Sequence, residues 1–190
     1  MEGKVMIKKS LLMALMTVLV GTTAWAQGSM LPESEMYVSG LKVGALESQM
    51  LNTFGQPTAI DRDQTSIDPK LRKFLRDLKT NYYNGLGFIT GFVPGFDMHG
   101  NEVYSAVLTD RSAVTHRGLA VGDSDERMFE LYGNDAQFIK HHGYTYVHGK
   151  KTKVDGEYRY RVNDGRGENS NAQMQVLIYK HTIVAISIGY

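Results

Sequence analysis

The sequence predicts an α+β protein made of two tandem repeats, each a short helix followed by a three- to four-stranded antiparallel sheet. The segment Gly40–Gly55 returns as Gly118–Gly133 at a constant offset, with the same glycines, a shared Met and an aromatic residue before the last glycine. Such self-similarity indicates a duplicated structural unit. After each copy the spacing of apolar residues changes from helical to alternating. We therefore expect a first repeat at 37–114 and a second at 115–190.

The N-terminus has the three parts of a secretory signal peptide. Lysines at positions 4, 8 and 9 precede the uncharged apolar run Leu11–Val20, and Ala24 and Ala26 fit the small-x-small cleavage rule. The run is about half of the roughly 20 apolar residues that span a bilayer. We expect residues 1–26 to be removed on export and residues 27–36 to form a flexible polar leader.

The chain of 190 residues contains no cysteine. This composition excludes disulfides, thiolate metal sites and the lipid-bearing cysteine of a bacterial lipoprotein. Beyond residue 26 there are 18 basic and 19 acidic side chains, so the chain has no general electrostatic reason to bind nucleic acid. We expect a periplasmic or extracellular protein that is not lipid-anchored.

Helical spacing predicts one short helix in each repeat. Met50 and Phe54 lie on one face of a helix expected at roughly 45–54, which Gly55 ends. Met128 and Tyr132 likewise lie on one face of a second helix, expected at roughly 124–132. For the second helix we expect a capping box between Asp123 and Glu126.

Alternating segments predict the strands. Glu157–Val162 places Tyr158 and Tyr160 on one face and its charged residues on the other, as in a half-buried antiparallel strand. The β-rich runs Gln173–Tyr179 and 182–188 are separated by Lys180 and His181, which indicates a hairpin. Val103–Leu108 is the corresponding strand of the first repeat.

A second short helix is predicted at 69–79, after a cap at Asp68 and a proline at Pro69. Its solvent-exposed side is basic, which suits binding to an anionic surface such as a phospholipid or lipopolysaccharide. The alternative is a helix with a purely structural role. The candidate contacts are Lys70, Lys73, Arg76 and Lys79.

No catalytic or metal-binding pattern emerges. His141 and His142 are adjacent, so on a strand they point to opposite faces and at most one of them shares a face with His148. No nearby carboxylate completes a zinc site, and no serine lies in a nucleophile-elbow pattern. We expect no cofactor, no metal and no enzymatic activity.

Aromatic residues on or beside the predicted strands are the candidate partner-binding residues. Tyrosine and phenylalanine are enriched at protein interfaces, although for any single ring core packing is the alternative. The glycine-broken, apolar segment 87–96 has the composition of a protruding loop. The candidates are Tyr82, Tyr83, Phe88, Phe92, Phe96, Tyr158 and Tyr160.

The repeated Gly-Leu-x-Val-Gly motif, with a Met, an aromatic-Gly ending and antiparallel strands after it, resembles the superfamily of β-lactamase inhibitory protein-like and BamE-like (SmpA/OmlA-like) proteins. The Gly55-Gln-Pro57 ending of the first helix is similar as well. The resemblance implies stacked α+β units and a non-enzymatic, protein-binding role. The shared residues are turns and core positions, so no partner-contacting residue carries over.

Three functional hypotheses follow from the sequence. The first is an exported protein-binding module, an inhibitor or adaptor of another secreted or envelope protein. The second is an envelope-associated assembly or structural factor that contacts the membrane through the basic helix. The third is a small hydrolase or metal-binding protein.

Overall fold

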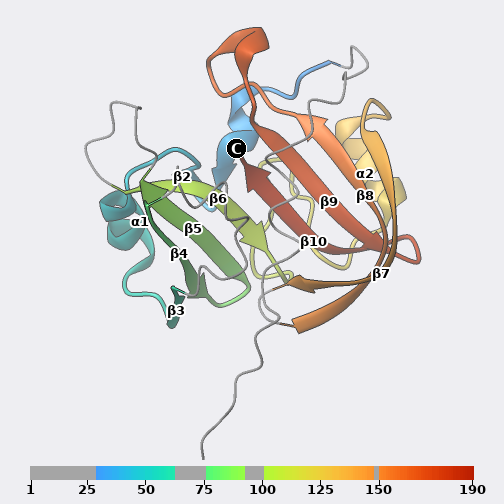
Figure 1. The fold of residues 1–190 in the computed structure, drawn as a ribbon. Helices are drawn as coiled ribbons and strands as arrows, with labels where there is room; N and C mark the ends of the chain where they lie inside the picture. The colour runs from blue at the N-terminus through green and yellow to red at the C-terminus, as the bar shows by residue number, and fades with distance from the viewer. Residues whose placement is uncertain (1–28, 63–75, 93–100, 148–149) are drawn as a thin grey trace, which may run out of the picture.

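The computed structural model describes residues 29–62, 76–92, 101–147 and 150–190, so the predicted signal peptide lies outside the described residues. Its main feature is one eight-stranded antiparallel sheet of order β3-β4-β5-β6-β10-β9-β8-β7 (Figure 1). The strands are β3 Ala59–Asp61, β4 Arg76–Tyr83, β5 Leu86–Phe92, β6 Glu102–Leu108, β7 Gln137–Val147, β8 Lys150–Arg161, β9 Gln173–Tyr179 and β10 Thr182–Gly189.

The prediction of two separate helix-plus-sheet repeats is wrong, because the strands of both halves of the chain belong to this one sheet. Strands β6 and β10 join the halves in antiparallel register, with Leu108 opposite Ile186 and Ser105 opposite Gly189. Both strands carry exposed backbone hydrogen-bonding groups unless another strand pairs with them. Pairing them with each other satisfies both edges, a long-range choice that local periodicity does not encode.

The remaining elements are short and lie beside the sheet. They are η1 Glu33–Met36, β1 Tyr37–Val38, β2 Leu41–Lys42, α1 Glu47–Phe54, α2 Asp125–Tyr132 and η4 Gly167–Asn169. Both helices lie within their predicted ranges. The predicted β9–β10 hairpin is confirmed: Lys180 and His181 have φ of 49° and 60°, the left-handed pair that a tight two-residue hairpin turn requires.

The two copies of the sequence motif hold the sheet in the same way. The Gly44 N–H donates to Val103 O on β6, and the Gly122 N–H donates to Ile183 O on β10. Both glycines have positive φ, 98° and 90°, which explains why glycine occurs in both copies. The glycines of the motif therefore anchor the chain before each helix to the two strands at the middle of the sheet.

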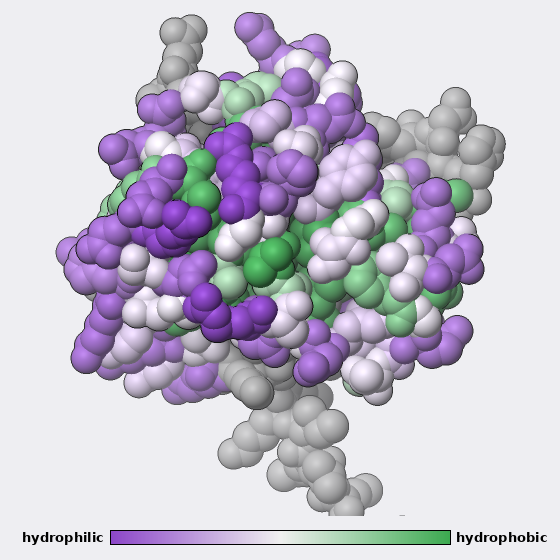
Figure 2. Space-filling model, turned by 180° about the vertical axis from the view of Figure 1, so that it is seen from behind, coloured by the Kyte–Doolittle hydropathy of each residue, from purple (hydrophilic) through white to green (hydrophobic). Residues whose placement is uncertain are grey.

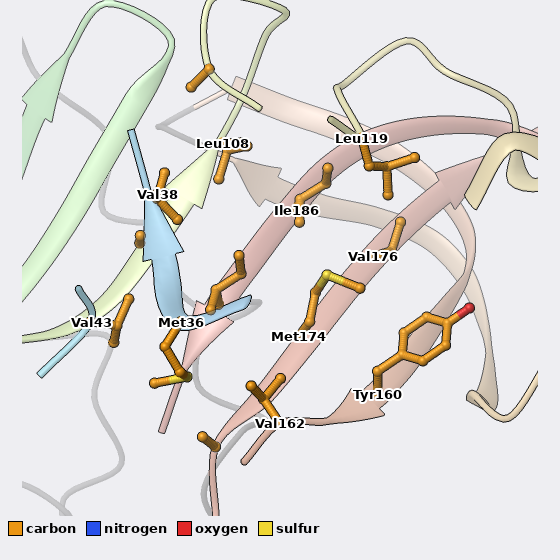
Figure 3. Close-up of a cluster of buried hydrophobic side chains, with 14 of the residues drawn as sticks. Met36, Val38, Val43, Leu108, Leu119, Tyr160, Val162, Met174, Val176 and Ile186 are labelled. Atoms are coloured by element: carbon orange, nitrogen blue, oxygen red, sulfur yellow. The ribbon is translucent and has the colours of Figure 1, made fainter. Parts of the chain in front are cut away.

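One face of the sheet forms the hydrophobic core with η1, β1 and the helices. Figure 3 shows Val38 near Leu108 of β6, and Met36 farther along the same segment, nearer to Val43 and Val162. Seen from behind, the surface carries hydrophobic patches between hydrophilic residues (Figure 2). The core is thus a single layer of side chains shared by both halves of the sheet.

The segment expected as part of a flexible leader is packed in the structure from Leu31 onward. Leu31 is buried, and its N–H donates to Arg161 O. Glu35 is fully buried and accepts from Arg117 Nε and from the Tyr132 hydroxyl, each at 2.8 Å. Burial is the main reason why the pKa of Tyr132 is raised. Because an unpaired buried carboxylate is costly, these two donors explain how the segment holds Glu35 in the core.

The predicted helix at 69–79 is wrong at its C-terminal end. Residues 76–79 are in β4, where Arg76 pairs with Phe92 and Lys79 with Thr90 of β5. Residues 69–75 lie outside the described residues. Strand pairing with β5 has overridden the apolar spacing that predicted the helix.

Candidate functional site

The side chains that do not face the core form a second, more polar face of the sheet, which we call the polar face. Register places one residue from each strand side by side in a row across it, because directly paired residues point the same way. This row consists of Ala59, Tyr82, Gly87, Val107, Ser187, Gln175, Arg159 and Gln137.

Small residues occupy the middle of the polar face, on β5, β6 and β10. The Ser105 and Ser187 hydroxyls lie 3.1 Å apart. A Cβ atom on Gly189 would lie 2.7 Å from Ser105 Cβ and 2.7 Å from Tyr104 O, so this position has room only for glycine. Larger side chains, Tyr82 on β4 and Gln175 on β9, flank this strip. Ser105 and Val107 in this strip are 8% and 2% exposed, so its residues are closely packed.

A charged cluster lies on β7 and β8, separated from the strip by β9. Glu157 is only 4% exposed, and its carboxylate pairs with Arg159 Nε and with His141 Nε2, the latter at 3.0 Å. A buried carboxylate needs such partners to offset its desolvation. The alternation predicted for β8 is confirmed. Glu157, however, was predicted on the solvent-exposed face and is buried.

Two glutamines in the same row carry buried amide atoms without a hydrogen-bond partner within the described ranges. These atoms are Gln137 Oε1 and Gln175 Nε2, and they flank Arg159 on neighbouring strands. Gln175 is 8% exposed. Buried polar atoms are paired in the large majority of cases, so unpaired ones call for an explanation.

Lysines and tyrosines gather farther along the polar face, toward the β7–β8 and β9–β10 turns. We call Tyr144, Lys151, Lys153, Tyr179 and Lys180 the lysine–tyrosine cluster. Lys151 Nζ lies 4.3 Å from the centre of the Tyr144 ring, and Lys153 and Lys180 lie 5.2 and 5.5 Å from that of Tyr179. A hydrogen bond to Tyr179 raises the pKa of Lys153. The cluster is therefore cationic and aromatic at once.

Four of the predicted partner-binding aromatics lie on the core side of the sheet. Phe88 is fully buried against Phe54, at 5.0 Å between ring centres, and next to Tyr83. Tyr160 is buried as well, and Tyr158 packs against Phe129 of α2. These four rings therefore pack in or against the hydrophobic core.

The other three aromatics are placed differently. Tyr82 lies on the polar face, Phe92 is half-buried at the end of β5, and Phe96 lies outside the described residues. Burial and the charge of Asp61 raise the pKa of Tyr82. Only Tyr82 of the predicted aromatics thus shares the row described above.

The predicted anionic-surface contacts are not brought together in the described structure. Lys79 forms an ion pair with Glu47 of α1 and is 15% exposed. Arg76 begins β4, while Lys70 and Lys73 lie outside the described residues. The basic helix of the second hypothesis is therefore not formed at 76–79.

Sequence reasoning missed the glutamines, the small strip and the lysine–tyrosine cluster. The signal for the cluster is visible in retrospect: Lys151, Lys153, Arg159 and Arg161 alternate with less charged residues along β8. The rows across the sheet have no such signal, because they depend on pairing between distant strands.

Within the described ranges, no three histidine or acidic side chains lie close enough together to hold a metal ion. The same residues contain no helix that is both long and apolar enough to cross a bilayer.

Comparisons with known proteins do not assign the chain to a family. No family model matches the chain, and no curated protein matches it. Among solved structures, the fold is similar to an extracellular protein containing an SCP domain from Bacillus anthracis str. Ames, with a TM-score of 0.42 and 11% identity. The match covers 77% of this chain and 43% of that one, so this chain spans less than half the length of that protein.

Proposed function

We propose that this protein is an exported, non-enzymatic binding module, an inhibitor or adaptor that holds another secreted or envelope protein on its polar face. The observation that carries the proposal is the row in which Gln137 and Gln175 flank Arg159 with unpaired buried amide atoms. Side-chain amides supply one acceptor and two donors and so match the groups of a peptide backbone. The resemblance to the inhibitory and assembly proteins supports the same class of function.

The shape of the polar face supports a protein ligand as well. The part of this face that a partner can reach lies toward the lysine–tyrosine cluster, where Tyr144 is 58% exposed, whereas Ser105 in the strip is 8% exposed. Interfaces combine such packed centres with polar groups that orient the partner.

The test uses crosslinking capture from envelope and culture-medium fractions with the purified protein and the variant Gln137→Ala/Gln175→Ala. The substitutions break no hydrogen bond at Gln137 Oε1 or Gln175 Nε2, which have none within the described ranges. Because both side chains also lose packing contacts, urea unfolding first establishes that the variant is folded, and we expect the folded variant to lose the partner that the parent protein captures. Gln56→Ala, at an exposed glutamine outside the sheet, is the matched control and keeps the partner. Equal capture by parent and double variant rejects the polar face as the binding surface.

A further inference from the structure

The three lysines of the lysine–tyrosine cluster lie against aromatic rings rather than against carboxylates. Within the described part of the chain, no ion pair involves Lys151, Lys153 or Lys180. The one acidic side chain beside them, Asp155, accepts from the Lys180 backbone N–H at 2.7 Å. An incoming anion therefore has no existing ion pair to break, because a contact with an aromatic ring does not neutralise a cation as a carboxylate does.

Two lysines of the cluster are spaced by the two-residue period of a β-strand. Lys151 and Lys153 are two residues apart on β8, so they point to the same face about 7 Å from each other. An extended peptide repeats its side chains with that same period. Acidic residues at alternate positions of such a peptide would therefore meet successive lysines, while Tyr144 and Tyr179 supply apolar contact beside them.

We propose that the lysine–tyrosine cluster binds an extended acidic segment of a partner protein, one with Asp or Glu at alternate positions. This inference rests on the proposed function and adds the chemistry of the partner. The segment lies over the start of β8, along Lys151 and Lys153; farther along the same face, Asp155 and Glu157 disfavour acidic residues of the partner. Charged groups at such an exposed surface act mainly on the association rate and on partner choice.

The observations favour a protein segment over other anionic partners. Clusters that recognise anionic membranes typically have four to eight basic residues, whereas this cluster has three, set among tyrosines on a strand. Nucleic acids call for a strongly basic domain, and this chain has 21 basic against 20 acidic side chains. A strand with a two-residue period matches a polypeptide in spacing as well as in charge.

The direct test measures binding of two synthetic peptides of equal composition by calorimetry at low salt. One alternates Glu and Thr over eight residues; the other has four Glu followed by four Thr. We expect the alternating peptide to bind at least about tenfold more tightly, since only that peptide places successive carboxylates at the spacing of the lysines. Equal affinities for the two peptides overturn the proposed spacing.

The variant Lys151→Gln/Lys153→Gln tests the site. We expect it to lose at least about tenfold in affinity for the alternating peptide, because it removes both lysines that face the carboxylates of the peptide. The control Arg62→Gln/Arg127→Gln removes the same charge from exposed positions elsewhere and is expected to change the affinity less than about twofold. If both variants lose the same affinity for the peptide, only the net charge of the protein matters, and the lysine–tyrosine cluster is not the binding site.

Two further probes separate the classes of anion. Phosphatidylglycerol vesicles and a sulfated polysaccharide are each titrated with the parent protein and the lysine variant. If either binds more tightly than the alternating peptide and loses binding in the lysine variant, the partner class is wrong. If the glutamine variant loses the captured partner but the lysine variant leaves peptide affinity unchanged, the proposed function stands and this inference fails.

Discussion

Four carboxylate side chains are buried in the described structure, and each lies against a basic side chain. Glu35 contacts Arg117, Glu157 contacts Arg159 and His141, Asp125 contacts His181, and Asp164 contacts Arg166. A buried carboxylate without a partner would shift toward its neutral form or unfold the region around it. Glu35 and Asp125 therefore depend on partners far along the chain, whereas Glu157 has Arg159 two residues away.

The pair of Asp125 and His181 predicts a pH dependence of stability. His181 Nδ1 lies 2.8 Å from Asp125 Oδ2, and this hydrogen bond, followed by the charge of Asp125, raises the pKa of His181. Because folding raises the pKa, the contribution to stability is complete below the unfolded pKa of about 6.5 and is lost as the pH rises through the folded pKa.

We expect the urea midpoint of the parent protein to exceed that of His181→Asn at about pH 6 and the gap to close by about pH 9. Asparagine is the replacement of choice because His181 has a φ of 60°, which Asn tolerates well. A gap of the same size at both pH values would show that the imidazole charge plays no part.

The two helices show how a local sequence difference changes an element. In α2 the Ser124 hydroxyl accepts from Arg127 N at 3.2 Å, whereas α1 has Leu46 at the same position. The predicted capping role of Asp123 is wrong: its carboxylate accepts from Ala120 N and pairs with Arg111. In α1 the Gln49 Oε1 accepts from the Leu46 N–H at 3.0 Å, but only α2 has an N-cap side chain that accepts from an N–H of its first turn.

This difference predicts opposite effects of two substitutions. Ser124→Ala is expected to lower the free energy of unfolding by about 1 kcal/mol, because it leaves that N–H without its acceptor. Leu46→Ser is expected to raise it by about 0.5 to 1 kcal/mol, because it introduces the missing acceptor. Urea unfolding of both variants checks the signs, and a loss of stability in Leu46→Ser would mean that packing of the leucine outweighs capping.

Local sequence patterns predicted the positions of helices and strands better than they predicted which strands pair with one another. The spacing around Met50 and Met128 places both helices, and the alternation at Tyr158 and Tyr160 places β8. The same kind of apolar spacing at 69–79 indicated a helix, where the structure has the start of β4. Periodicity alone is ambiguous in a short segment, and pairing between strands resolves it.

In the molecule as a whole, the contact between β6 and β10 makes one sheet from the two halves of the chain. Gly189 on β10 is opposite Ser105 on β6, and there is no room for a side chain between them. Because the core layer is shared across this contact, the two halves are expected to unfold together.

Gly189→Ala tests that expectation. A Cβ atom 2.7 Å from Tyr104 O forces the two strands apart, so we expect a loss of about 1 to 3 kcal/mol in the free energy of unfolding. Hydrogen exchange should show faster amide exchange in β5 and β9 alike. Ser187→Ala, which removes only the hydroxyl contact with Ser105, is the mild control. Faster exchange in β9 with β5 unchanged would mean that the halves unfold independently.

The sequence by itself determined the two motifs, the helices that follow them, most of the strand positions and the absence of disulfides. Those features depend on residues close together in the chain, such as Gly44 before α1 and Gly122 before α2. Only the tertiary structure decided that β6 pairs with β10, that Phe88 is buried, and that Gln175 and Arg159 share a face with the lysine–tyrosine cluster. The physical reason is that strand pairing joins segments of any separation, so one choice of partner strand fixes which side chains lie together.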